Sequence, residues 1–157
     1  MGKHPRWAQS LFSESDFDAI ARAVADAETA TSAEIRVHFE RRVPRARGTP
    51  RADALGRARD VFAQLEMHRT ALRHGVLIYL ALEDRQVAIV GDEGIHARVG
   101  DAYWPQIRDL MVERLRRGES RAAVVDAVSE LGRSLARHFP RQPGDTNELS
   151  DSVSVEP

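Results

Sequence analysis

Apolar side chains recur at helical spacing in four segments of the chain, which predicts four amphipathic helices. The predicted helices span about residues 14–30, 55–65, 102–117 and 120–138. Ser13 stands in the N-cap position of the first helix, and Gly118 stands in the C-cap position of the third. Leu55 and Leu110 are among the positions that the periodicity assigns to buried stripes.

Three other segments have the pattern of β-strands. The segment EIRVHFE, residues 34–40, alternates apolar and polar positions, which predicts a strand with one buried face. The continuous apolar run GVLIYLAL, residues 75–82, is typical of a central strand covered on both faces. The segment QVAIV, residues 86–90, follows after a short turn and is expected to form a hairpin with it.

The order of these elements predicts an α/β fold. A helix separates the first two strands, and such a strand–helix–strand unit is expected to be right-handed and to place its strands parallel. The hairpin then adds an antiparallel strand, so the sheet is small and mixed, with helices layered on it.

Length and composition predict one domain, residues 11–140, between a flexible N-terminus, residues 1–10, and a disordered acidic tail, residues 141–157. The chain has 157 residues and no cysteine, which excludes disulfides and thiolate metal sites. It is expected to be a monomer.

Charge and hydropathy exclude several classes of protein. The net charge of −1 argues against a nucleic-acid-binding protein. No apolar run approaches the ~18 residues of a membrane helix, and the N-terminus has no signal-peptide pattern, so we expect a cytoplasmic protein without membrane insertion. Residues 41–51 include five Arg and no acid, which is typical either of a solvated loop or of a surface that contacts nucleic acid, phosphate or an acidic partner. The loop has no interleaved aromatic residues for base stacking, which weakens the nucleic-acid alternative.

The predicted topology gathers acidic residues at one end of the sheet. Glu34 and His74 lie where the two parallel strands start, and the antiparallel strand returns Asp92 to the same end, with Asp101 a further candidate. Because neighbouring carboxylates repel each other, a hard divalent cation is the natural counter-charge. The alternative is that Asp92 and Asp101 serve only as helix N-caps.

Several of these segments resemble the TPM domain family, which is named after a thylakoid lumen protein, a photosystem II repair protein and a nematode receptor modulator. The resemblance is carried by TSAEIRVHFE, GVLIYLALEDRQVAIVGDEGI, DAYWPQI and the closing HFP, and it extends from about Leu11 to Pro140. It is greatest to the small soluble bacterial branch of the family.

The resemblance implies a three-layer helix–sheet–helix sandwich that binds a divalent cation, most often calcium, through acidic residues at one end of the sheet. The motif match assigns Glu34 and Asp92 as metal ligands, and we add Asp101 and His74 as further candidates. His74 stands where the family usually has Asn, and an imidazole there would extend the choice of ion from calcium or magnesium toward zinc or nickel.

The resemblance leaves the activity open. Some plant relatives are described as acid phosphatases, so the alternatives to a metal-binding protein of unknown role are a metal-assisted phosphatase acting on small phosphomonoesters and a protein-interaction module with a structural metal. The sequence assigns no catalytic residue. Arg73 is the one cationic side chain near the predicted cluster that could bind a phosphate group, which gives the phosphatase alternative little support. The sequence has no P-loop, no G-x-S-x-G elbow and no G-x-G-x-x-G motif.

Overall fold

The computed structural model describes residues 4–9, 11–44, 53–67, 74–100, 102–141 and 154–155, and every structural statement below refers to these residues. The helices are α1 (Arg6–Gln9), α2 (Glu14–Glu28), α3 (Ala54–Gln64), α4 (Glu93–Val99), α5 (Tyr103–Arg116) and α6 (Ser120–His138). The strands are β1 (Glu34–Glu40), β2 (Gly75–Ala81), β3 (Gln86–Gly91) and β4 (Ser154–Val155).

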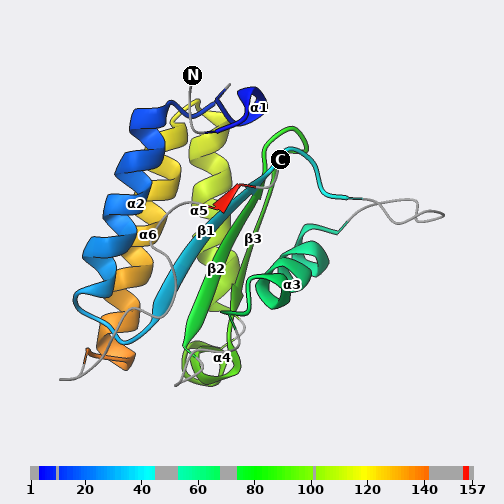
Figure 1. Cartoon of the computed structure of the whole chain (residues 1–157). Helices are drawn as coiled ribbons and strands as arrows, with labels where there is room; N and C mark the ends of the chain where they lie inside the picture. Colours follow the sequence, from blue (N-terminus) through cyan, green and yellow to red (C-terminus); the bar gives the residue numbers. More distant parts are fainter. Residues whose placement is uncertain are drawn as a thin grey trace.

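The elements form a three-layer helix–sheet–helix sandwich, which confirms the predicted fold class (Figure 1). The sheet has the order β3-β2-β1-β4, with β1 and β2 parallel and β2 and β3 antiparallel. Helices α2, α5 and α6 lie on one face of the sheet, and α3 lies on the other. The short helix α4 lies at the end of the sheet where β1 and β2 begin.

The helical layer of α2, α5 and α6 covers the larger hydrophobic core. Alternate side chains of all three long strands point into it, including Ile35, Ile78 and Ile89, and they pack against buried residues of the helices. Helices α2 and α6 approach closely at Gly132, where an added Cβ would lie 2.7 Å from the Cβ of Ala27. The apolar residues at every second position of β1 are therefore the ones whose side chains enter this core.

The opposite face of β1 is also buried, and the prediction that this strand has only one buried face is wrong. His38 and Glu40 are each 2% exposed beneath α3. The carboxylate of Glu40 accepts two hydrogen bonds from the guanidinium of Arg57 in α3, both 2.7 Å, and one of 2.6 Å from the Tyr79 hydroxyl. A helix that carries its own counter-charge thus covers a polar strand face without leaving the buried carboxylate unpaired.

Burial lowers the pKa of His38 to about 4, against the opposing effect of Glu40. Because unfolded histidine titrates near 6.5, the stabilisation associated with neutral His38 is complete above that pH and is lost as the pH falls toward 4, by up to about 3 kcal/mol. We expect His38→Gln to flatten this part of the stability profile, measured by urea unfolding between pH 7.5 and 4. The matched control is His138→Gln, at the exposed end of α6. An unchanged slope in His38→Gln would contradict the assignment.

Most predicted element boundaries and most positions of the predicted apolar stripes agree with the structure, with two exceptions. Leu55 is 40% exposed and Leu110 is 57% exposed, so their assignment to buried stripes is wrong. Ser13 caps α2 in a capping box with Asp16, and Gly118 follows α5 with a φ of 78°, as the sequence predicts.

The two ends of the chain contribute more structure than the sequence indicates. The four-residue helix α1 lies before α2, and His4 hydrogen-bonds Glu14 through Nδ1, at 2.7 Å, and stacks on the Phe17 ring. At the other end, β4 pairs in parallel with β1. The rest of the predicted acidic tail after Arg141 lies outside the described residues. No helix in the described part of the chain is long and apolar enough to cross a membrane.

Candidate metal centre

Glu34, Gly75 and Asp92 lie side by side on neighbouring strands at one end of the sheet. Glu34 is paired with Gly75 in the parallel register of β1 and β2, and its amide donates to the His74 carbonyl at 2.9 Å. The amide of Asp92 donates to the Gly75 carbonyl at 2.8 Å, which continues the β2–β3 pairing by one residue. The predicted convergence of Glu34, His74 and Asp92 at this end is therefore present in the backbone.

The two carboxylates lie on the same face of the sheet, with a glycine between them. Residues paired across neighbouring strands share a face, so Glu34 and Asp92 flank the position where Gly75 has no side chain. Both are buried, with 4% and 7% of their surfaces exposed. Two strand spacings separate their backbones by about 10 Å.

A backbone oxygen faces the same position. The carbonyl oxygen of Met67 lies 3.1 Å from the place where a Cβ on Gly75 would stand. Glu66, just before it, has a φ of 57°, so the chain after α3 turns sharply here. An alanine at position 75 would crowd this carbonyl, and its Cβ would also lie 3.5 Å from Cζ of Phe62 and 3.6 Å from Cβ of Met67, so these two residues pack directly over the glycine.

The two carboxylate oxygens of Asp92 have different surroundings. Its Oδ1 accepts a hydrogen bond of 2.8 Å from the amide of Glu93, and the residue is the N-cap of α4, as the cap alternative predicts. Its Oδ2 is buried and has no hydrogen-bond partner among the described residues. A buried carboxylate oxygen normally has a partner, so capping does not account for the whole side chain.

The side chain of His74 faces a different group of residues. Its ring lies 4.0 Å from the Phe139 ring and its Nδ1 lies 3.3 Å from the Ser32 hydroxyl. Thr31 donates to the Phe139 carbonyl at 2.6 Å. The HFP segment at the end of α6 thus packs beside the TSAE segment, which brings the motifs of the resemblance to the same end of the fold.

The remaining predicted ligand, Asp101, lies outside the described residues, as does Arg73. Within the described ranges, no group of three or more His, Asp or Glu side chains is placed to hold a metal ion. The described part of the site is therefore a pair of carboxylates with a nearby carbonyl, and Asp101 and His74 stay predictions.

Sequence reasoning missed two oxygen-bearing groups at this end. The Met67 carbonyl has no side-chain signal, because any residue supplies a backbone oxygen. Glu28, the last residue of α2, is in helical phase with the buried Ile20 and Val24, and this spacing is the signal that could have found it. It is 2% exposed, and its Oε2 accepts from the Ile35 amide at 2.8 Å. Glu28 therefore bonds the β1 edge that faces away from β2.

Comparison with protein families identifies one family over most of the chain. The family model described as the TPM domain matches residues 7–134. This match includes β1, β2 and β3, and with them Glu34 and Asp92. A search of curated proteins gave no match.

Two solved structures share the fold. The BA42 protein of the psychrophilic bacterium Bizionia argentinensis is 37% identical, with a TM-score of 0.80, over 92% of this chain and 95% of that protein. The N-terminal domain of a P. gingivalis protein is 16% identical, with a TM-score of 0.64, over 82% of this chain and 79% of that domain, and it shows likeness of fold alone.

Proposed function

This chain belongs to the TPM domain family, and on that premise we propose that it binds a divalent cation, calcium first, between Glu34 and Asp92. The observation that carries the proposal is the placement of two buried carboxylates on one sheet face, flanking a glycine beneath the Met67 carbonyl.

Electrostatics supports a cation at this position. Two buried carboxylates that share one end of a sheet repel each other, and each loses hydration on burial. A divalent ion offsets both effects and supplies a partner for the buried Oδ2 of Asp92.

The chemistry of the donors favours a hard cation. Glu34 and Asp92 would supply carboxylate oxygens, and Met67 would supply a carbonyl oxygen, which is a ligand set typical of calcium completed by water. The Nδ1 of His74 lies 3.3 Å from the Ser32 hydroxyl, so a nitrogen ligand from this residue would be its Nε2. The oxygen donors of Glu34, Asp92 and Met67 favour calcium or magnesium over zinc or nickel.

A metal-assisted phosphatase remains the alternative activity implied by the resemblance. A bound ion supplies Lewis acidity toward a phosphoryl oxygen. Arg73, the cation that the sequence offers for gripping a phosphate, lies outside the described residues, and no observation of the described site favours this activity over simple binding.

Calorimetric titration of chelator-treated protein with calcium, magnesium, zinc and nickel tests the proposal. We expect calcium to bind more tightly than about 1 mM, the weak end of protein calcium sites, and Glu34→Gln to weaken it at least about tenfold. Glu113→Gln, an exposed acid on α5, is the matched control and should bind as the parent does. Failure of all four ions to bind below about 1 mM would refute the proposal.

A further inference from the structure

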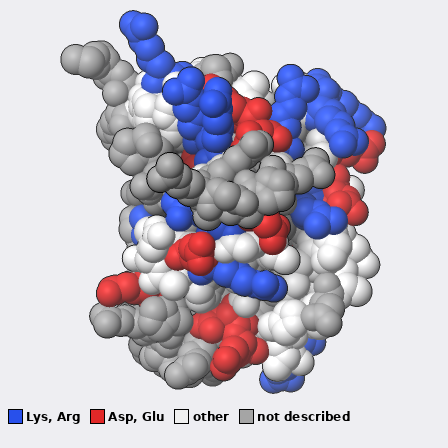
Figure 2. Space-filling view, turned by 90° about the vertical axis from the view of Figure 1, so that its right-hand side faces the viewer, with Lys and Arg blue, Asp and Glu red and all other residues white. Residues whose placement is uncertain are grey.

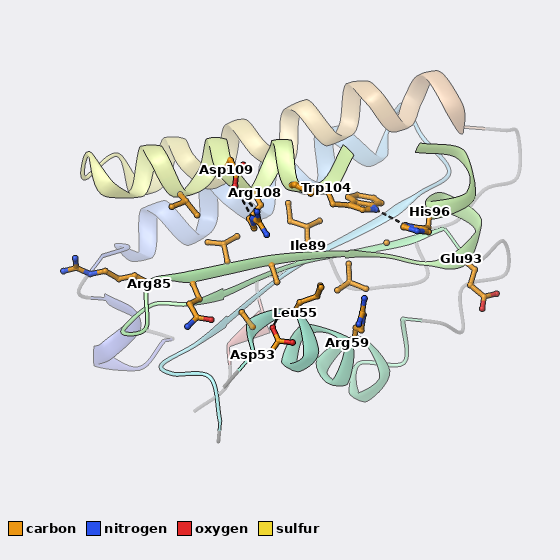
Figure 3. A pocket seen from close by; sticks show the side chains of 18 residues that line it. Asp53, Leu55, Arg59, Arg85, Ile89, Glu93, His96, Trp104, Arg108 and Asp109 are labelled. Carbon is orange, nitrogen blue, oxygen red and sulfur yellow. Dashed lines mark hydrogen bonds and ion pairs between the residues drawn. The ribbon is translucent and has the colours of Figure 1, made fainter. Parts of the chain in front are cut away.

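The two sides of the sheet are closed in different ways. On the β3 side, Val87 and Ile89 are 7% and 5% exposed on the floor of a groove of about 1000 Å³ between α3 and α5 (Figure 3). The rim of this groove carries both signs of charge: Asp53, Glu93 and Asp109 with Arg59, Arg85 and Arg108. Both signs also occur on the side of the molecule in Figure 2, so charge selects no partner there. The two helices cover this side, and the other side is bounded by β1 and the short strand β4.

The backbone groups of alternate β1 residues face away from β2. The amide of Glu34 donates to the His74 carbonyl at 2.9 Å, so Glu34 bonds the β2 side. Alternate residues of a strand bond alternate neighbours. The N–H and C=O groups of Ile35, Val37 and Phe39 therefore form the outer edge of β1.

A buried carboxylate closes the first part of this outer edge. The Oε2 of Glu28, at the end of α2, accepts a hydrogen bond of 2.8 Å from the Ile35 amide. Glu28 is 2% exposed, and inward-pointing charged residues are a usual protection of a sheet edge. An added strand cannot pair here without displacing a side chain that belongs to α2.

The last part of the outer edge is closed by the chain's own strand β4, which lies beside β1 in Figure 1. The pairing is parallel, with Ser154 at the position of His38 and Val155 at that of Phe39. In this register the N–H and C=O of Ser154 face β1, between the C=O of Val37 and the N–H of Phe39. Strands usually have about 3–10 residues, and β4 has two, so few bonds hold it.

The chain is fixed beside the start of β1 before it reaches β4. The amide of Arg141 donates to the Ala30 carbonyl at 3.2 Å, and its Nη1 donates to the Glu28 carbonyl at 2.8 Å. Residues 142–153 connect this point to β4. A linker of this length gives its end an effective concentration of roughly 1 mM. A second copy of the chain at a lower concentration therefore competes poorly with β4 for the same edge.

We propose that Ser154–Val155 is a strap that closes the β1 edge within one molecule, and that the edge beneath it is an acceptor site for one added β-strand. The occupant is this chain's own segment, whose sequence SVSV, residues 152–155, alternates polar and apolar residues as β1 does. Release of the strap exposes the N–H of Phe39 and the C=O of Val37, which can then pair with the same sequence supplied from another molecule.

Amide exchange of the full chain, followed by NMR, tests the strap. Ser154→Pro removes the N–H that faces β1 and should speed exchange of the Phe39 amide at least about tenfold. Ser154→Ala keeps this N–H and is the matched control. The Ile35 amide is an internal control on the same edge, because it bonds Glu28 and should exchange within about twofold of the parent rate in both variants.

Addition of the strand as a peptide tests the acceptor site. Ac-SDSVSVEP-NH2, the sequence of residues 150–157, should bind the Ser154→Pro chain more tightly than about 1 mM and restore slow exchange of the Phe39 amide. The parent should bind it at least about tenfold more weakly, because the strap occupies the edge. Ac-SDVSVSEP-NH2 has the same composition with its serines and valines exchanged, and it should bind Ser154→Pro at least about tenfold more weakly than the matched peptide.

Three results would each overturn the proposal. The first is equal exchange of the Phe39 amide in Ser154→Pro and Ser154→Ala, and the second is equal binding of the two peptides. The third is faster exchange of the Phe39 amide when the parent is diluted, which would show that the strand on β1 comes from a second copy. No metal enters these experiments, so their outcome is independent of calcium binding.

Discussion

Replacing Arg57 with alanine is expected to lower the free energy of unfolding by about 3–5 kcal/mol. The substitution removes two of the three hydrogen bonds that the Glu40 carboxylate accepts from Arg57 and Tyr79, while the side chain of Glu40 remains 3% exposed. Hydrogen bonds from Arg57 and Tyr79 outweigh burial and keep the pKa of Glu40 below its usual value. Since domains of this size are stable by about 5–15 kcal/mol, the loss is a large fraction of the total.

Urea unfolding of two arginine variants on the same helix measures this effect. Arg59→Ala, two residues further along α3, removes an exposed side chain without an ion pair in the described residues and should change stability by no more than about 0.5 kcal/mol. Combining Arg57→Met with Glu40→Gln should recover part of the loss, because the buried charge then disappears with its partner. A loss below about 1 kcal/mol in Arg57→Ala would show that water reaches Glu40.

The same residues show where pattern reading of the sequence reaches its limit. The alternation in residues 34–40 correctly predicts a strand and the face that packs on the large core. It cannot tell whether the polar face meets water or a helix, because that depends on Arg57, whose placement opposite Glu40 is a tertiary property.

Helical periodicity has a similar limit. Leu55 and Leu110 occupy positions in phase with buried neighbours, yet each is exposed, because the width of a buried stripe depends on what packs against the helix. The exposed Leu55 lies in the wall of a groove between α3 and α5, a position that the sequence alone gives no reason to expect.

The candidate metal site was more predictable, because it follows from strand direction. A parallel pair followed by a hairpin must return Asp92 to the end where Glu34 starts, and the structure has this arrangement. Asp84 lies at the other end, where it accepts a hydrogen bond from the amide of Val43, also as topology requires. The carbonyl of Met67 could not be predicted, because its position depends on the path of the chain after α3.

The glycine between the carboxylates links the fold to the proposed function. A side chain on Gly75 would crowd the Met67 carbonyl, so the glycine lets this carbonyl approach the sheet between the strand positions of Glu34 and Asp92. The same end of the sheet is held by main-chain bonds from β1 to β2 and from β2 to the start of α4. Such a rigid frame suits a site whose ligands must converge on one ion.

Asp92→Asn is expected to remove most of the stabilisation that calcium confers, with little change in the metal-free protein. Asparagine is as good an N-cap as aspartate and keeps one oxygen for the Glu93 amide, so α4 retains its cap. The substitution removes the carboxylate charge and the buried Oδ2. A free ion concentration of 100 times Kd stabilises a folded protein by about 2.7 kcal/mol, and a 100-fold weaker site would gain only about 0.4 kcal/mol at that concentration.

Asp53→Asn provides a matched comparison, because Asp53 is the N-cap of α3 and its Oδ1 accepts from the Leu55 amide at 3.1 Å. Urea unfolding with and without calcium should give Asp53→Asn the full response of the parent and Asp92→Asn almost none. Equal responses in the two variants would place the bound calcium elsewhere on the protein. A large loss of metal-free stability in Asp92→Asn alone would instead mean that the buried carboxylate serves the fold through contacts other than its cap, because both substitutions preserve a capping oxygen.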